Sequence, residues 1–198
     1  MNIKDYKCFL QNNFLSEDLF SALMQTKESY VTRNNIIVDS NKNVDFKNEG
    51  SEGWVRTYVS ELDDLASIFN IHFIELFKLT KQKLIIEGAS NPRLHGIRFY
   101  RNPESMAWHK DYHEDNIPDN KRLLCVFMLG PELPENQSDT FTVSIYPDSP
   151  GHWGLGFVAQ LKPKTIVGHN QMFGHEFFHP NVNTMDNRDI LTLLWYDE

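Results

Sequence analysis

Two histidines and a carboxylate, spaced like the ligands of an open metal site, are the residues of this sequence that point most clearly to chemistry. His109 and Asp111 are separated by one residue, so on an extended segment both side chains point to the same face. A second histidine follows far downstream, as His175 or His179. Two histidines and one carboxylate on one face of a metal ion leave the opposite positions open for a substrate and oxygen.

The downstream histidines also belong to a zinc-peptidase motif. The sequence from His175 to His179 reads HEFFH, which matches HExxH with Glu176 as the general base. This motif needs a helix, because histidines four residues apart converge on zinc only at helical spacing. Gly174 precedes the motif and Pro180 follows it, and both are unfavourable in a continuing helix. A zinc metallopeptidase is therefore the alternative interpretation of this stretch.

Length and charge limit the classes of protein to consider. The 198 residues are enough for one domain with a sizeable core, and we predict a single domain over 1–198. The net charge of −8 argues against binding along a nucleic-acid backbone, which needs clustered Lys and Arg. The longest apolar stretches have the length of a strand, so we expect no membrane-spanning segment.

The cysteines and the N-terminal segment bear on the compartment. Cys8 and Cys125 lie in unrelated contexts, so we expect no structural disulfide. Residues 1–7 lack the apolar core of a signal peptide. Both observations favour the reducing cytoplasm.

The N-terminal part, residues 1–92, has the apolar spacing of helices. Ser16 precedes an acidic first turn and is expected to cap a first helix. Ser60 and Asp63 fit a capping box, which predicts the start of a longer helix with a wide apolar face.

From residue 93 onward the apolar period becomes that of strands. Strands are predicted at 96–100, 123–129, 140–146, 164–167 and 190–196, with Pro and Gly between them. Helices followed by short strands predict an α+β fold: a double-sheet barrel or jelly roll over 93–198, with the N-terminal helices packed on one sheet.

The order of these features resembles the Fe(II)- and 2-oxoglutarate-dependent dioxygenases, in particular their prolyl-hydroxylase-like branch. The resemblance covers most of the chain but rests on few identities. It is carried by the strand with Tyr100, His109-x-Asp111, the buried strand 123–129, His175-Glu176, and Arg188 before an apolar closing strand. It implies a double-stranded β-helix that binds Fe(II), with 2-oxoglutarate and O2 as cosubstrates and ascorbate as a supporting reductant.

The resemblance also implies roles for individual histidines. His109, Asp111 and one later histidine would bind the iron. We favour His175 as this distal ligand, because it is followed by glutamate as in prolyl-hydroxylase-like members, and keep His179 as the alternative. His169 is expected to have a structural role.

Cosubstrate contacts follow from the same resemblance. Arg188 would pair with the far carboxylate of 2-oxoglutarate in the two-pronged geometry of a guanidinium group. Thr192 lies four residues later, hence on the same strand face, and would hydrogen-bond that carboxylate. Tyr100 is the expected third contact, and Arg98 is the next candidate should Arg188 not be the anchor.

The expected activity is a hydroxylase that converts 2-oxoglutarate to succinate and CO2. Asp111 favours hydroxylation over halogenation, because related halogenases lack that carboxylate. The expected substrate is an amino acid, a peptidyl side chain or another small metabolite. A non-catalytic binding module with the same jelly-roll fold is a further alternative.

Overall fold

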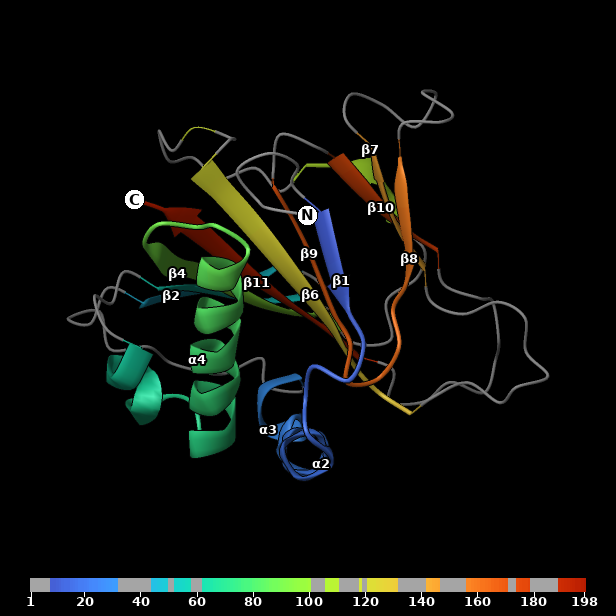
Figure 1. Cartoon of the computed structure of the whole chain (residues 1–198). Coiled ribbons are helices and arrows are strands. Elements are labelled where there is room, and N and C mark those ends of the chain that lie inside the picture. The colour runs from blue at the N-terminus through green and yellow to red at the C-terminus, as the bar shows by residue number, and fades with distance from the viewer. Residues whose placement is uncertain are drawn as a thin grey trace.

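The computed structural model describes most of the chain as two antiparallel sheets with helices on one side. The described residues are 8–31, 44–49, 52–57, 62–100, 106–110, 118, 121–131, 142–146, 156–170, 174–178 and 189–198. A seven-stranded sheet has the order β1-β9-β6-β11-β4-β3-β2, and a four-stranded sheet has the order β5-β10-β7-β8. Figure 1 shows α2, α3 and α4 on one side of the large sheet, and β7, β8 and β10 of the small sheet on the other.

The elements have the following bounds. The large sheet contains β1 (Cys8–Gln11), β2 (Val44–Glu49), β3 (Glu52–Thr57), β4 (Pro92–Tyr100), β6 (Arg122–Leu129), β9 (Ile166–Asn170) and β11 (Asp189–Asp197). The small sheet contains β5 (Met106–His109), β7 (Thr142–Tyr146), β8 (Phe157–Gln160) and β10 (Gly174–Phe178). The helices are α2 (Glu17–Thr26), α3 (Glu28–Val31), the 3-10 helix η2 (Leu62–Ser67) and α4 (Ile71–Ile86).

The large sheet is buried on both faces, which gives the molecule two apolar cores. On β11, Leu191 and Leu193 pack under the helices, while Ile190 and Leu194 pack between the two sheets. This alternation is that of a strand, in which successive side chains point to opposite faces. Thr192 therefore faces the space between the sheets, the interior of the barrel.

The helices confirm one predicted cap and correct another. The Ser16 side chain accepts a hydrogen bond from the Leu19 backbone N–H and caps α2, as predicted. The longer helix does not begin at Ser60. Its N-cap is Asn70, whose side chain accepts from the N–H groups of His72 and Phe73, and η2 precedes it as a separate turn.

The expectation that residues 1–92 are helical is only partly right. β1 extends the large sheet at one edge, and β3 and β2 extend it at the other. Sheet pairing explains the difference, because β3 is held by backbone hydrogen bonds to β4, and β2 to β3. The strands predicted after residue 93 are confirmed as β4, β6, β7, β9 and β11, with shifted ends.

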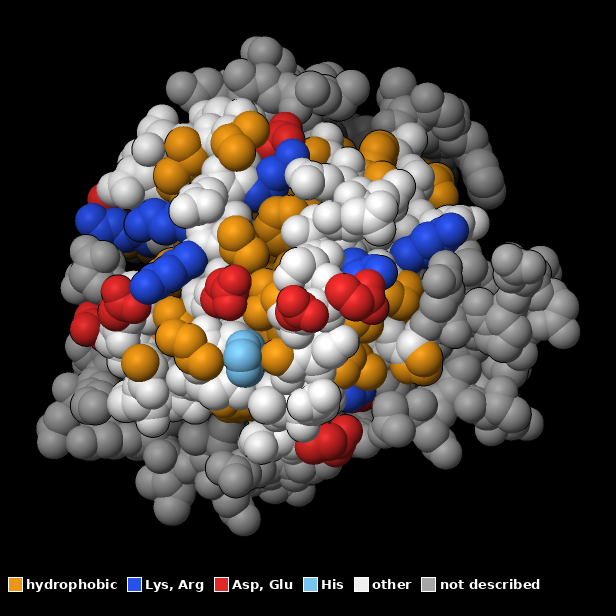
Figure 2. All heavy atoms as spheres, turned by 60° about the horizontal axis from the view of Figure 1, so that its bottom comes forward, with side chains coloured by type: hydrophobic (Ala, Val, Ile, Leu, Met, Phe, Trp, Pro, Cys, Tyr) orange, Lys and Arg blue, Asp and Glu red, His pale blue; other side chains and the backbone are white. Residues whose placement is uncertain are grey.

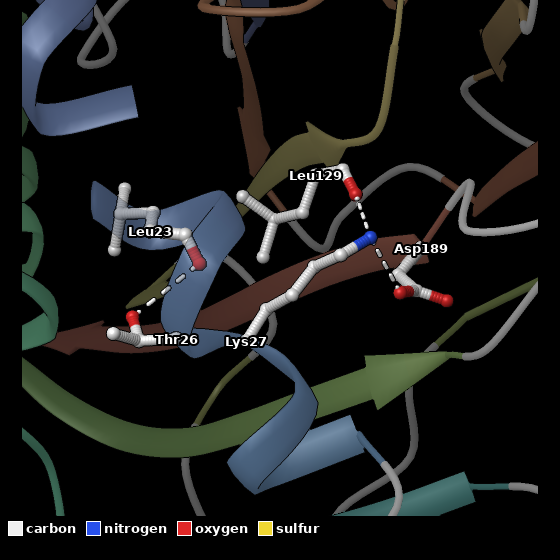
Figure 3. A network of polar contacts seen from close by, with 5 residues as sticks. All are labelled: Leu23, Thr26, Lys27, Leu129 and Asp189. Atoms are coloured by element: carbon white, nitrogen blue, oxygen red, sulfur yellow. Dashed lines mark hydrogen bonds and ion pairs between the residues drawn. The ribbon is translucent and has the colours of Figure 1, made fainter. Parts of the chain in front are cut away.

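A buried ion pair fixes α2 to the large sheet. Lys27, at the C-terminus of α2, donates a hydrogen bond to the Leu129 carbonyl oxygen at 2.6 Å. Its Nζ atom also lies 2.8 Å from Oδ2 of Asp189, and the two side chains are only 3% and 0% exposed. Figure 3 shows Lys27 reaching between the end of β6 and the start of β11. The pair therefore holds the first residue of β11 in place.

Surface and thiol features agree with the composition. On the face shown in Figure 2, basic and acidic side chains are interspersed with apolar ones and form no single basic patch. None of the helices in the described part of the chain is long and apolar enough to cross a membrane. Cys8 and Cys125 are both free thiols, as expected. Burial raises the pKa of Cys8 to about 12, so it is protonated at neutral pH.

Candidate active site

Two histidines face each other on neighbouring strands of the small sheet. β5 and β10 are antiparallel, and their register places His109 directly opposite His175. The two imidazole rings have centroids 4.3 Å apart at an interplanar angle of 58°. His175 is 1% exposed, and His109 is half-buried. The structure thus brings together two residues that are far apart in the sequence and that we predicted to share a site.

A close contact on the opposite face of the small sheet supports this pair. Trp108 and Gly174 each stand next to one of the two histidines in sequence, so their side-chain positions lie on the other face. A Cβ atom added to Gly174 would lie only 2.1 Å from Cε2 of Trp108. The absence of a side chain at Gly174 therefore lets the indole ring lie directly against β10.

The surroundings of His175 keep its imidazole neutral. Burial is the largest cause that lowers the pKa of His175 well below its usual value, followed by the charges of His169, His109 and Arg98. A metal ion binds the neutral form of histidine, since a protonated imidazole nitrogen has no lone pair to donate. The environment of His175 therefore fits a metal ligand.

His169 extends the pair to a row of three histidine rings. Its ring centroid lies 5.0 Å from that of His175, at an interplanar angle of 62°. It is 1% exposed, and its Nδ1 atom lies 3.0 Å from the carbonyl oxygen of Asn170. The sequence analysis assigned His169 a structural role and missed this position. Extending the strand alternation from Val167 by two residues would have placed His169 on the interior face.

The remaining predicted metal ligands fall outside the described residues. Asp111 and the alternative ligand His179 are among these residues. In the part of the chain that the structure describes, no three His, Cys, Asp or Glu side chains form a cluster that could hold a metal ion. His109 and His175 are the two described candidates, and their imidazole nitrogens are donors that suit iron(II).

The predicted cosubstrate residues are placed in part. Arg188 lies outside the described residues. Tyr100 ends β4 opposite Ile190 of β11, and only its backbone is described. Thr192 is 5% exposed and lies directly opposite Arg98 of β4, with its side chain on the interior face.

The zinc-peptidase interpretation is wrong. Gly174–Phe178 form strand β10, in which Glu176 pairs with Ser144 of β7. Residues four apart in a strand are about 13 Å apart along its axis, so the helical convergence on which HExxH depends is absent. Pairing with strands on both sides explains why this stretch is extended.

Comparisons with known proteins place this architecture among solved structures. No protein-family model matches the sequence, and no curated protein matches it. A prolyl-4-hydroxylase from Pseudomonas putida is 15% identical with a TM-score of 0.53, over 99% of this chain and 96% of that one. The epimerase SnoN, in complex with Fe3+, α-ketoglutarate and nogalamycin RO, is 11% identical with a TM-score of 0.62, over 99% and 81%.

A third solved structure extends the range of activities. EctD from S. alaskensis, with 2-oxoglutarate and 5-hydroxyectoine, is 12% identical with a TM-score of 0.60, over 96% of this chain and 72% of that one. All three share the fold across nearly the whole of this chain at low sequence identity. The predicted α+β double-stranded β-helix is confirmed, and the fold is that of iron- and 2-oxoglutarate-dependent oxygenases.

Proposed function

We propose that this chain is an iron(II)- and 2-oxoglutarate-dependent oxygenase, and more narrowly a hydroxylase. The observation that carries the proposal is the His109–His175 pair, which lies in register on two strands of the small sheet. Such a pair, joined by one carboxylate, is the ligand set that suits non-heme iron(II) with open positions. The shared fold with solved enzymes of this chemistry supports the same conclusion.

The residues of this chain divide the work of the site. His109 and His175 would bind iron through neutral imidazoles, and Asp111 would supply the carboxylate one position beyond Lys110. Bound iron(II), together with 2-oxoglutarate and O2, supplies the oxidising chemistry, and 2-oxoglutarate leaves as succinate and CO2. The buried wall around His175 limits the access of water to the site.

Hydroxylation and the substrate class are the finer parts of the proposal. Neighbours of this fold include a hydroxylase and an epimerase, so the fold does not decide between these outcomes. We assign hydroxylation because Asp111 is present in the His-x-Asp pair. The proposed substrate is an amino acid, a peptidyl side chain or another small metabolite, acted on in the reducing cytoplasm with ascorbate as a supporting reductant.

The direct test is metal content together with 2-oxoglutarate turnover in the purified protein. The proposal expects succinate formation that requires iron(II) and O2. Metal binding without turnover of 2-oxoglutarate in a folded protein would instead favour the non-catalytic binding module.

Single variants then test the ligand assignment. His109→Ala, Asp111→Ala and His175→Ala are expected to lose iron-dependent turnover and bind Mn(II) much more weakly. His179→Ala should retain the metal, and His72→Ala on the surface of α4 is the control for the loss of a histidine. Loss of the metal in His179→Ala but not in His175→Ala would make His179 the distal ligand.

A further inference from the structure

Arg98 is a cationic side chain on the interior face of the large sheet. Its neighbours on β4, Ile97 and Phe99, are buried in the helix-side core, so Arg98 points to the opposite face, into the barrel. The strand register places it directly opposite Thr192 of β11. Residues that face each other across antiparallel strands have Cα atoms about 5 Å apart and side chains on the same face.

The charge of Arg98 acts at the histidine pair. It is one of the groups that lower the pKa of His175, so the guanidinium lies within electrostatic reach of the proposed metal site. Arginine keeps its charge at any pH at which the protein is folded, and its planar group matches a carboxylate in two-pronged geometry. The barrel interior therefore contains a permanent positive charge beside the metal site.

Strand geometry separates this position from that of Arg188. β11 begins at Asp189, three residues before Thr192, which corresponds to about 10 Å along a strand. Arg188 precedes Asp189 in the sequence, so its backbone is further still from the Thr192 hydroxyl. Arg98 is the arginine that the register brings next to Thr192, and the two can contact one carboxylate together.

We propose that Arg98 and Thr192 form a carboxylate-binding subsite beside the His109–His175 pair. The subsite binds the carboxylate adjacent to the keto group of 2-oxoglutarate, and Arg188 binds the far carboxylate. Arg98 supplies the charge, and the Thr192 hydroxyl donates a hydrogen bond to the same group. This inference rests on the proposed function and adds the residues that hold the second end of the cosubstrate.

The test uses calorimetry on Mn(II)-loaded protein, which reports binding without turnover. Two ligands are compared: 2-oxoglutarate, and 2-oxovalerate, which has the same chain length but lacks the far carboxylate. Arg98→Gln is expected to weaken both ligands at least about tenfold, because both carry the keto-side carboxylate. Arg188→Gln should weaken 2-oxoglutarate and leave 2-oxovalerate nearly unchanged.

Further variants separate binding from folding. Arg98→Lys keeps the charge without the planar fork and should recover part of the affinity. Thr192→Val should cost less than Arg98→Gln, and the double variant should lose less than the sum of the two, since both residues contact one group. Arg93→Gln is the matched control, because Arg93 lies on the same strand but pairs with Glu198 on the surface.

The outcomes distinguish the subsite from the function as a whole. Unchanged affinities in a folded Arg98→Gln variant would overturn the subsite alone. Weakening of 2-oxoglutarate without weakening of 2-oxovalerate would move Arg98 to the far carboxylate and overturn the assignment made here. A wild-type protein that binds Mn(II) but no 2-oxoglutarate would overturn the proposed function, and the subsite with it.

Discussion

Replacing Lys27 with methionine tests whether the buried ion pair fixes the start of β11. In the wild type, Nζ lies 2.8 Å from Asp189 Oδ2 and 2.6 Å from the Leu129 carbonyl oxygen, in surroundings that exclude water. Lys27→Met keeps the apolar stem but leaves a buried carboxylate without its cation. Removing one partner of such a pair costs about 3–5 kcal/mol, a large part of the roughly 5–15 kcal/mol by which domains are stable.

The assay is urea unfolding followed by circular dichroism at neutral pH. The control is Lys78→Met, which removes the cation from the Lys78–Asp63 pair, whose side chains are 49% and 75% exposed. Exposed pairs contribute at most about 1 kcal/mol, so this control should change the free energy of unfolding little. The double variant Lys27→Met/Asp189→Asn leaves no buried charge and should recover at least about 2 kcal/mol of the loss.

One result would refute this reasoning. If Lys27→Met and Lys78→Met change the free energy of unfolding by the same small amount, the Lys27–Asp189 pair does not hold α2 and β11 together.

Three further predictions concern the surroundings of the histidine pair. Gly174→Ala should force Trp108 to move, change the tryptophan fluorescence and cost about 1–3 kcal/mol of stability; an unchanged spectrum and stability would show that the indole does not lie against Gly174. Because the pKa of His175 is lowered on folding, the unfolded chain binds a proton below about pH 6.5 that the folded chain does not. The free energy of unfolding of the metal-free protein should therefore fall as the pH decreases below that value, by up to about 1.4 kcal/mol per pH unit, and His175→Phe should flatten this dependence; equal slopes in both proteins would contradict it. His169→Ala removes the ring beside His175 and should weaken Mn(II) binding by about tenfold, whereas unchanged affinity would leave His169 with a packing role alone.

Much of the large sheet could be predicted from the sequence because its strands carry strong local signals. The core of β6 is a continuous apolar run, as expected of a strand that is buried on both faces. β5, β8 and β10 of the small sheet contain only four or five residues, too few for a clear alternation. β2 and β3 are polar and mixed, and they are ordered by pairing with β4 and not by their own composition.

The candidate site was predictable to the extent that spacing constrains it. His109 and His175 could be paired in advance through the His-x-Asp spacing and the family resemblance, but their register could not. His169 was missed because its strand was predicted to end too early. Arg98 was considered only as a substitute for Arg188, since its alignment with Thr192 depends on how β4 and β11 pair.

The most direct test of the central claim is a crystal structure of the protein with Mn(II) and 2-oxoglutarate, grown without oxygen. The account predicts one metal ion bound by His109, Asp111 and His175, with 2-oxoglutarate in the barrel between that metal and the large sheet. A metal ion bound elsewhere, or 2-oxoglutarate bound outside the barrel, would contradict it.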